Sequence, residues 1–163
     1  MTEETVLSQF PSPRHNHRRC IADAMADAEK HCRTHGLRLT PIRRRVLELI
    51  WQDHVPIKAY DLLSLLQQEG HKAAPPTVYR ALDFLIDAGV VHRLDTLNAF
   101  VGCVDPATDH SGQFFICTQC QMVAEIRSTS IGQAIEKEAV KVGFRVRSRP
   151  MEIPGLCPRC ANH

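Results

Sequence analysis

The stretch Phe114–Cys120, FFICTQC, ends in one C-x-x-C pair, and a second C-x-x-C pair lies near the end of the chain. A thiolate is a strong ligand for Zn²⁺, and four sulfurs from two such turns make a closed tetrahedral site. Residues 121–156, between the pairs, include one amphipathic helical pattern. The spacing therefore predicts a small domain held together by a structural zinc ion. The predicted ligands are Cys117, Cys120, Cys157 and Cys160.

Disulfides and a redox-active C-x-x-C are the alternatives. The N-terminal segment lacks the apolar region of a signal peptide, and no apolar run reaches the roughly 18 residues of a membrane span. We therefore expect a cytoplasmic protein, whose thiols stay reduced, and the seven cysteines do not pair evenly. A redox pair normally starts a helix in a βαβ unit, which we expect of neither pair here, and no H-E-x-x-H is present. An enzyme with a small organic substrate is not expected, and no membrane partner is expected either.

Length and composition are those of a globular protein with one domain or two small ones, since 163 residues are 44% hydrophobic and 23% charged. A net charge of +2 is weak support for nucleic-acid binding. Basic residues do cluster at 14–19 and at Arg43, Arg44 and Arg45. Each run is compatible with a nucleic-acid contact or with an ordinary solvated face.

Residues 20–104 have the order of a winged helix-turn-helix domain. Apolar spacing predicts a helix at 20–35, a second after Thr40-Pro41, a third at Ala59–Glu69 and a fourth from Pro75 to about Ala88. Two β-prone runs follow, Val90–Asp95 and Ala99–Val104, and their short link predicts a hairpin. A small helical bundle that binds nothing is the alternative.

In a winged-helix domain, the last helix enters the DNA major groove by its N-terminal turn. Tyr79 and Arg80 lie in this turn of the sequence. We therefore expect Arg80 to contact a base edge, and we expect Thr77, Tyr79 and Tyr60 to be further DNA contacts.

Residues 105–112, DPATDHSG, have no periodicity and predict a linker. The domain after it, at 113–163, is expected to contain strands at Phe114–Cys120 and Met122–Ile126, a helix capped by Ser128–Ser130, and a third strand within Phe144–Ile153. Such a core is marginal alone, so a bound metal ion would supply folding energy. The fold class is α+β, with residues 1–19 as a mobile arm; His15, His17 and Cys20 are potential ligands there without an assigned role.

A second group of potential ligands is spread over the sequence. His92 and Cys103 fall on the two wing strands, His110 in the linker, and Glu125 on the strand after the first cysteine pair. Together they would make a mixed nitrogen, sulfur and oxygen site that spans both domains. Separately, each is compatible with an ordinary surface or buried side chain.

Three stretches carry a family resemblance: PPTVYRALDFL (Pro75–Leu85), VVHRLDTLNAFVGC (Val90–Cys103) and FFICTQC, preceded by RLTPIRRRVLELI (Arg38–Ile50). Over about residues 22–161 the chain resembles the ferric uptake regulator family, and within it most closely the zinc-sensing branch. The resemblance implies a homodimeric, metal-dependent repressor that binds palindromic operator DNA and represses zinc uptake genes. Regulators of iron or of peroxide through iron, and a zinc-stabilised DNA-binding protein without metal sensing, remain alternatives.

By position, the four cysteines match the structural zinc site of the family. His92, Cys103, His110 and Glu125 match the regulatory site of its zinc-sensing branch, which implies two Zn²⁺ per protomer. Iron-sensing members carry an H-H-D-H-like cluster, where this chain reads Asp109-His110-Ser111-Gly112. A Cys103 thiolate softens the site and favours Zn²⁺ over Fe²⁺. Because its ligands come from two domains, zinc would select one domain orientation and so permit DNA binding.

Overall fold

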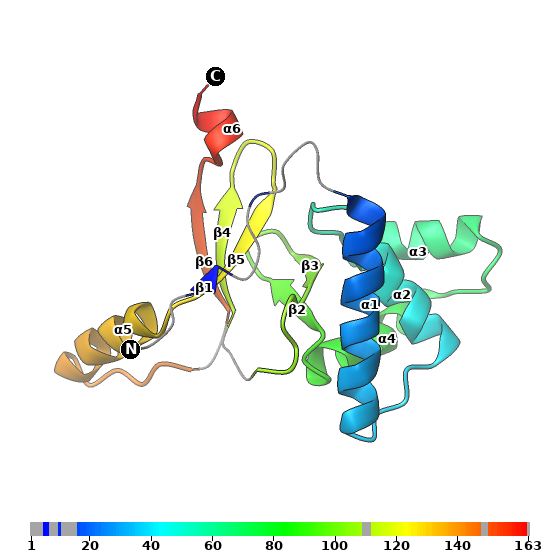
Figure 1. Cartoon of the computed structure of the whole chain (residues 1–163), viewed down its shortest axis with the longest axis horizontal. Helices are drawn as coiled ribbons and strands as arrows, with labels where there is room; N and C mark the ends of the chain where they lie inside the picture. Colours follow the sequence, from blue (N-terminus) through cyan, green and yellow to red (C-terminus); the bar gives the residue numbers. More distant parts are fainter. Residues whose placement is uncertain (1–4, 7–9, 11–15, 109–111, 148–149, 163) are drawn as a thin grey trace. The chain divides into compact units, whose positions relative to one another are not determined.

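The computed structural model describes residues 5, 6, 10, 16–108, 112–147 and 150–162, and it is drawn in Figure 1. The chain forms two compact units. One unit spans Pro11–Asp109, and the other combines Met1–Phe10 with His110–His163. The boundary between residues 109 and 110 falls inside the linker predicted at 105–112.

The first unit is helical with a small two-stranded wing. Its elements are α1 (His17–Thr34), α2 (Pro41–Trp51), α3 (Ala59–Gln68), α4 (Pro75–Asp87), β2 (Val91–Leu94) and β3 (Ala99–Gly102). Helix α1 begins three residues earlier than position 20, because the Asn16 side chain accepts a hydrogen bond from the N–H of Arg19 and caps it. The predicted order of a winged helix-turn-helix is confirmed.

The core of this unit is built from one apolar stripe on each helix. Leucines of α3 and α4 lie at its centre, where Leu62, Leu66, Leu82 and Leu85 are fully buried. Helix α1 contributes Met25, Ala28 and Cys32, as the helical spacing predicts, and α2 contributes Val46, Leu47, Leu49 and Ile50. Burial of the leucine, isoleucine, valine and methionine side chains, about 1.5–3 kcal/mol each, holds the four helices together.

The wing is an antiparallel hairpin in which His92 faces Val101 and Val91 faces Gly102. Asn98 closes its turn in the left-handed region, with φ 47°, a conformation that asparagine tolerates better than most residues. Strand β3 is also held by Ile57, which exchanges two backbone hydrogen bonds with Phe100 at 3.1 and 2.8 Å. The wing is therefore attached to the connection between α2 and α3.

The second unit is a four-stranded sheet with one long helix. Its elements are β1 (Thr5–Val6), β4 (Gln113–Cys117), β5 (Val123–Arg127), α5 (Thr129–Lys141), β6 (Met151–Gly155) and α6 (Pro158–Ala161). The strand order is β1-β5-β4-β6, and β6 runs parallel to β4 while the other pairs are antiparallel. The sheet and helix were predicted, whereas β1, α6 and the parallel pairing were not.

Helix α5 buries little of its surface within its own protomer. The Ser128 side chain accepts a hydrogen bond from the N–H of Ile131 and so caps the N-terminus of α5, as expected. Among its described residues, however, Ala139 alone is buried, and Val140, Val142 and Phe144 at its C-terminal end are 76%, 79% and 65% exposed. A single protomer therefore leaves apolar surface here that a monomer would rarely expose.

The N-terminal arm lies largely outside the described residues. Within them, Thr5–Val6 pairs with Arg127 and Ile126 of β5, which departs from the prediction of an arm without structure. No helix in the described ranges is long and apolar enough to cross a membrane.

Candidate metal centres and nucleic-acid interface

The two C-x-x-C pairs meet because β4 and β6 are adjacent and parallel. Cys117 ends β4 and pairs with Gly155 of β6, so Cys157 follows two residues beyond the same point of the sheet. The first turn is closed by the N–H of Gln121, which donates to the carbonyl of Cys117 at 2.9 Å, with Gln121 in the left-handed region at φ 61°. The sheet register thus delivers both turns to one place.

The four sulfurs have the spacing that a tetrahedral metal site needs. The Sγ atoms of Cys117, Cys120, Cys157 and Cys160 all lie within 4.8 Å of one another. Between the pairs, Cys120 Sγ and Cys157 Sγ are 3.7 Å apart. Zn–S bonds of about 2.3 Å at tetrahedral angles place sulfurs about 3.8 Å apart, whereas a disulfide needs about 2.05 Å. The cysteine cage therefore fits a bound zinc ion and not a disulfide between these two sulfurs.

The electrostatics of the cage favour a cation. Backbone N–H groups of Cys120 and Cys157 point at the sulfur of Cys117 and lower the pKa of that thiol to about 6. Burial, followed by contacts with Cys157 and Cys120, raises the pKa of Cys160 to about 12. The Cys117 thiolate thus forms readily while the Cys160 thiolate is costly, and a divalent ion would stabilise both thiolates together.

The second cysteine pair corrects one expectation. Cys157 is the N-cap of α6, so this pair does begin a helix, contrary to the sequence-based expectation. That helix has four residues, and the sulfur of Cys157 lies close to a cysteine of the other pair. The arrangement remains that of a metal cage.

The wing brings together two of the four ligands expected for a second metal site. His92 lies on β2 and Cys103 directly follows β3, and their ligand atoms are within 4.8 Å of each other. The N–H of Cys103 donates to the carbonyl of Val90 at 2.9 Å, and its side chain is 5% exposed. An imidazole beside a buried thiol is a donor pair suited to Zn²⁺.

The other two expected ligands belong to the second unit. Glu125 lies on β5 opposite Phe114 of β4, and its side chain is 2% exposed. A carboxylate this deeply buried needs partners, and a metal ion is one of the partners that proteins use. His110 lies outside the described residues.

Two of the expected DNA contacts, Tyr60 and Thr77, lie in the first turns of α3 and α4, whereas Tyr79 and Arg80, expected in the first turn of α4, are its fifth and sixth residues and lie in the second turn. Tyr60 is the second residue of α3 and is 77% exposed; Tyr79 and Arg80 are exposed in the first half of α4, and Thr77 is half-buried there. The first turn of α4 contains no acidic residue that would repel phosphate, but Pro75 and Pro76 have no N–H group and the Thr77 N–H donates to the Ala74 carbonyl, so a phosphate there would be bound through side chains. Arg80 forms no ion pair with another residue in the part of the chain that the structure describes.

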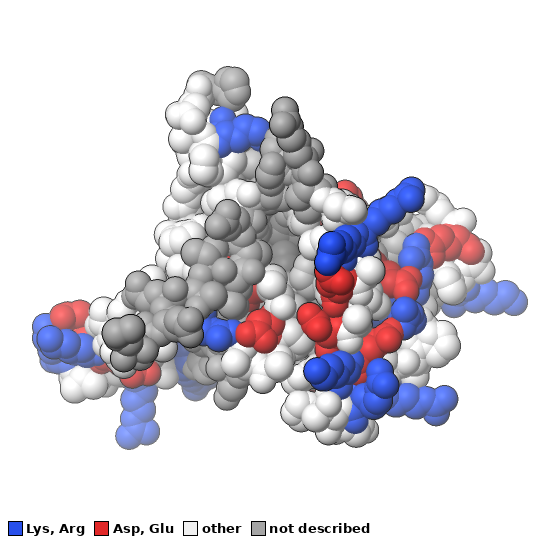
Figure 2. Space-filling model, viewed as in Figure 1, with Lys and Arg blue, Asp and Glu red and all other residues white. Residues whose placement is uncertain are grey.

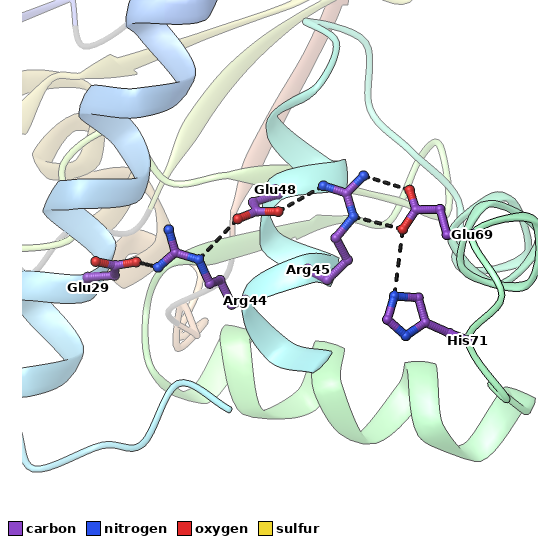
Figure 3. Close-up of polar contacts among 6 residues, drawn as sticks. All are labelled: Glu29, Arg44, Arg45, Glu48, Glu69 and His71. Carbon is purple, nitrogen blue, oxygen red and sulfur yellow. Dashed lines mark hydrogen bonds and ion pairs between the residues drawn. The ribbon is translucent and has the colours of Figure 1, made fainter. Parts of the chain in front are cut away.

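The arginine triplet of α2 has a different use. Arg44 pairs with Glu29 of α1 and with Glu48, and Arg45 pairs with Glu48 and with Glu69, which follows α3 (Figure 3). Arg43 stacks on the Phe84 ring of α4, with its guanidinium carbon 3.6 Å from the ring centroid. The triplet therefore joins the helices of the unit, and Figure 2 accordingly shows basic and acidic side chains interleaved over this face.

Sequence reasoning did not foresee these contacts, because the carboxylate partners of Arg44 and Arg45 come from other helices. The one local signal was Glu48, which lies three residues after Arg45 and four after Arg44. Two residues of the N-terminal region were also placed: His17 contacts the carbonyl of Gln52 and packs its ring on His54, and Cys20 lies half-buried on α1. His15 lies outside the described residues.

Comparison with known proteins agrees with this architecture. The model of the ferric uptake regulator family matches residues 34–154. The zinc uptake regulation protein of Escherichia coli is 41% identical over 140 residues, which cover 85% of this chain and 81% of that protein. A solved zinc uptake regulator complexed with zinc and DNA is 39% identical, with a TM-score of 0.78 over 87% of this chain and 95% of the other. The holo form of a regulator named XcZur is 42% identical, also with a TM-score of 0.78, over 88% and 99%.

Proposed function

The chain belongs to the ferric uptake regulator family, and from this we propose that it is a zinc-responsive transcriptional repressor. As a member of that family it is a DNA-binding regulator that works as a dimer, and not an enzyme. Its relatives act in zinc uptake regulation, so genes for zinc uptake are the proposed targets. The exposed apolar residues Val140, Val142 and Phe144 are surface that a dimer could cover.

The cysteine cage is proposed to bind a structural zinc ion through Cys117, Cys120, Cys157 and Cys160. Its four sulfurs come from one compact unit, so the ion would bind tightly and remain bound. In a closed Cys₄ site, zinc contributes folding energy and has no open position for chemistry. This ion would hold together the ends of the adjacent strands β4 and β6 in the second unit.

A second zinc ion is proposed as the signal. The observation that carries this is the proximity of His92 and Cys103 on the wing, where a ring nitrogen of His92 and the sulfur of Cys103 lie within 4.8 Å of each other. His110 and Glu125 are proposed to complete the shell. Thiolate and imidazole donors favour Zn²⁺ over Fe²⁺, which supports a zinc sensor more than an iron or peroxide sensor.

The proposed ligands belong to two units of the chain, and this gives zinc a way to control DNA binding. An ion that binds only when all four ligands converge stabilises that arrangement by its own binding free energy. A dimer reaches two half-sites only at one spacing of its two recognition helices. Zinc would therefore raise the population of the DNA-competent dimer.

The test is to follow zinc content and DNA binding through graded chelation. We expect two zinc ions per protomer at first, and mild chelation should remove one together with DNA binding while the dimer survives. Re-adding zinc should restore binding, and Fe²⁺ at equal free concentration should restore much less. Loss of one zinc with unchanged DNA binding would contradict the proposal.

A further inference from the structure

Gly102, the last residue of β3, lies directly against the indole of Trp51. A Cβ atom built on Gly102 would be 2.1 Å from Trp51 Cε2 and 2.4 Å from both Cζ2 and Nε1. Contacts under about 3 Å are far inside the van der Waals minimum of 3.5–4.0 Å between carbon atoms. No side chain larger than hydrogen is therefore compatible with the present position of the indole.

The close contact, and not backbone conformation, is the reason that glycine is needed at position 102. Gly36, Gly70, Gly89 and Gly143 have positive φ values, but Gly102 is outside that region. An alanine at 102 would therefore meet no backbone penalty. Its methyl group would instead push either the indole or strand β3 aside.

This contact is adjacent to both wing ligands of the proposed sensing site. Cys103 is the next residue, and Gly102 pairs across the hairpin with Val91, the neighbour of His92. Phe100 is already held two residues earlier by its backbone bonds to Ile57. A displacement at Gly102 is therefore resisted on the Phe100 side, and on the other side it would strain the bond of the Cys103 N–H to the Val90 carbonyl and shift Cys103.

The indole belongs to the end of a helix. Trp51 is the last residue of α2 and is half-buried against the core of the helical unit, so its ring is placed by that packing. Because the Trp51 ring contacts the backbone of Gly102 directly, it fixes the distance between strand β3 and the end of α2. Metal ligands must be placed to within about 0.2 Å, so this distance matters for binding.

We propose that Trp51 and Gly102 are positioning residues that set the location of the Cys103 sulfur and thereby the zinc affinity of the sensing site. The proposal rests on the function proposed above and adds to it a mechanical link between the wing ligand and helix α2. Residues that orient metal ligands typically change metal affinity by about 10–100-fold when mutated.

The test is a double-mutant cycle in which the sizes of residues 102 and 51 are changed singly and together. Gly102→Ala should lower the zinc affinity of the sensing site by about 10–100-fold, while the zinc of the cysteine cage stays bound. Trp51→Leu removes the ring, so adding Gly102→Ala to Trp51→Leu should cost less than about threefold. The control is Gly132→Ala, which adds the same methyl group where nothing lies within 4 Å. Affinities would be measured by competition with a calibrated chelator.

A second readout uses wild-type protein alone. Trp51 is the single tryptophan of the chain, so its emission should change with zinc at the same free concentration that fills the sensing site.

The proposed function fails if wild type takes up no second zinc. The positioning role fails, with that function intact, if wild type responds but Gly102→Ala binds zinc normally. The positioning role also fails if adding Gly102→Ala to Trp51→Leu lowers the zinc affinity tenfold or more. That comparison can be made even if the Gly102→Ala variant alone does not fold.

Discussion

Arg45 of α2 forms a bidentate ion pair with Glu69, which directly follows α3. The Nε and Nη2 groups of Arg45 donate to Oε2 and Oε1 of Glu69 at 2.8 and 2.6 Å, while Nη1 donates to Glu48 at 2.8 Å. The bonds from Arg45 lower the pKa of the Glu69 carboxyl below its ordinary value. A basic run that resembles a nucleic-acid patch in the sequence thus joins two helices of the fold.

Replacing Glu69 tests this joining role and its pH dependence. Because the folded-state pKa of Glu69 is lowered, its contribution is fully present above the ordinary value of 4.5 and is lost as pH falls through the folded-state value. Glu69→Gln should therefore lower the urea midpoint equally at about pH 7.5 and about pH 5.5.

The comparison is best made with His71→Asn in both proteins, since the His71 imidazole lies 3.7 Å from Glu69 and is a second partner of this carboxylate beside Arg45. A destabilisation that disappears on going down to pH 5.5 would contradict the lowered pKa. DNA binding, corrected for stability, should not change.

Arg80 should carry base discrimination. A bidentate contact to guanine is worth about 1–3 kcal/mol against the wrong base, so Arg80→Ala should lose roughly that much preference for operator over random DNA. The matched control is Arg44→Ala, because Arg44 is already engaged by Glu29 and Glu48. We expect the control to lose stability and keep its preference. Equal weakening on both DNAs by Arg80→Ala would make it a phosphate contact only.

The cysteine cage should decide whether the second unit folds. Cys117→Ser removes a cage ligand whose thiol has a lowered pKa, so the protein should lose the cage zinc and residues 113–163 should become sensitive to protease. The helical unit has its own core and should resist. Cys20→Ser, outside both clusters, should keep its zinc and its resistance. A Cys117→Ser protein with full zinc content and normal resistance would show that the cage is not the structural site.

The sequence predicted the local elements well, because their signals are local. The apolar spacing of α1 to α4, the prolines at the start of α2 and α4 and the Ser128 cap are all visible within a few residues. The C-x-x-C pairs likewise predicted a four-sulfur site. Their meeting depends on β6 lying parallel to β4, a contact over some forty residues that no local pattern encodes.

The remaining misses have the same physical origin. The uses of Arg43, Arg44 and Arg45 are set by partners on other helices, and the contact of Trp51 with Gly102 joins residues from α2 and β3. The exposure of the apolar residues at the C-terminal end of α5 could not be predicted either, because helical periodicity shows that a face is apolar, and not whether its own protomer covers it.

Zinc sensing itself is tested most directly by DNA binding at buffered free zinc. A duplex enriched from random sequence by the zinc-loaded protein would be titrated by fluorescence anisotropy, with wild type and Cys103→Ser compared and the dimer checked by sedimentation. Cys103→Ser removes the softest proposed ligand while the cysteine cage stays complete, so the variant should remain a folded dimer. Wild type should bind the duplex steeply as zinc rises, and the variant should bind only weakly at the same free zinc, because its competent fraction is small. Equal binding by both proteins at every zinc concentration would contradict sensing through Cys103.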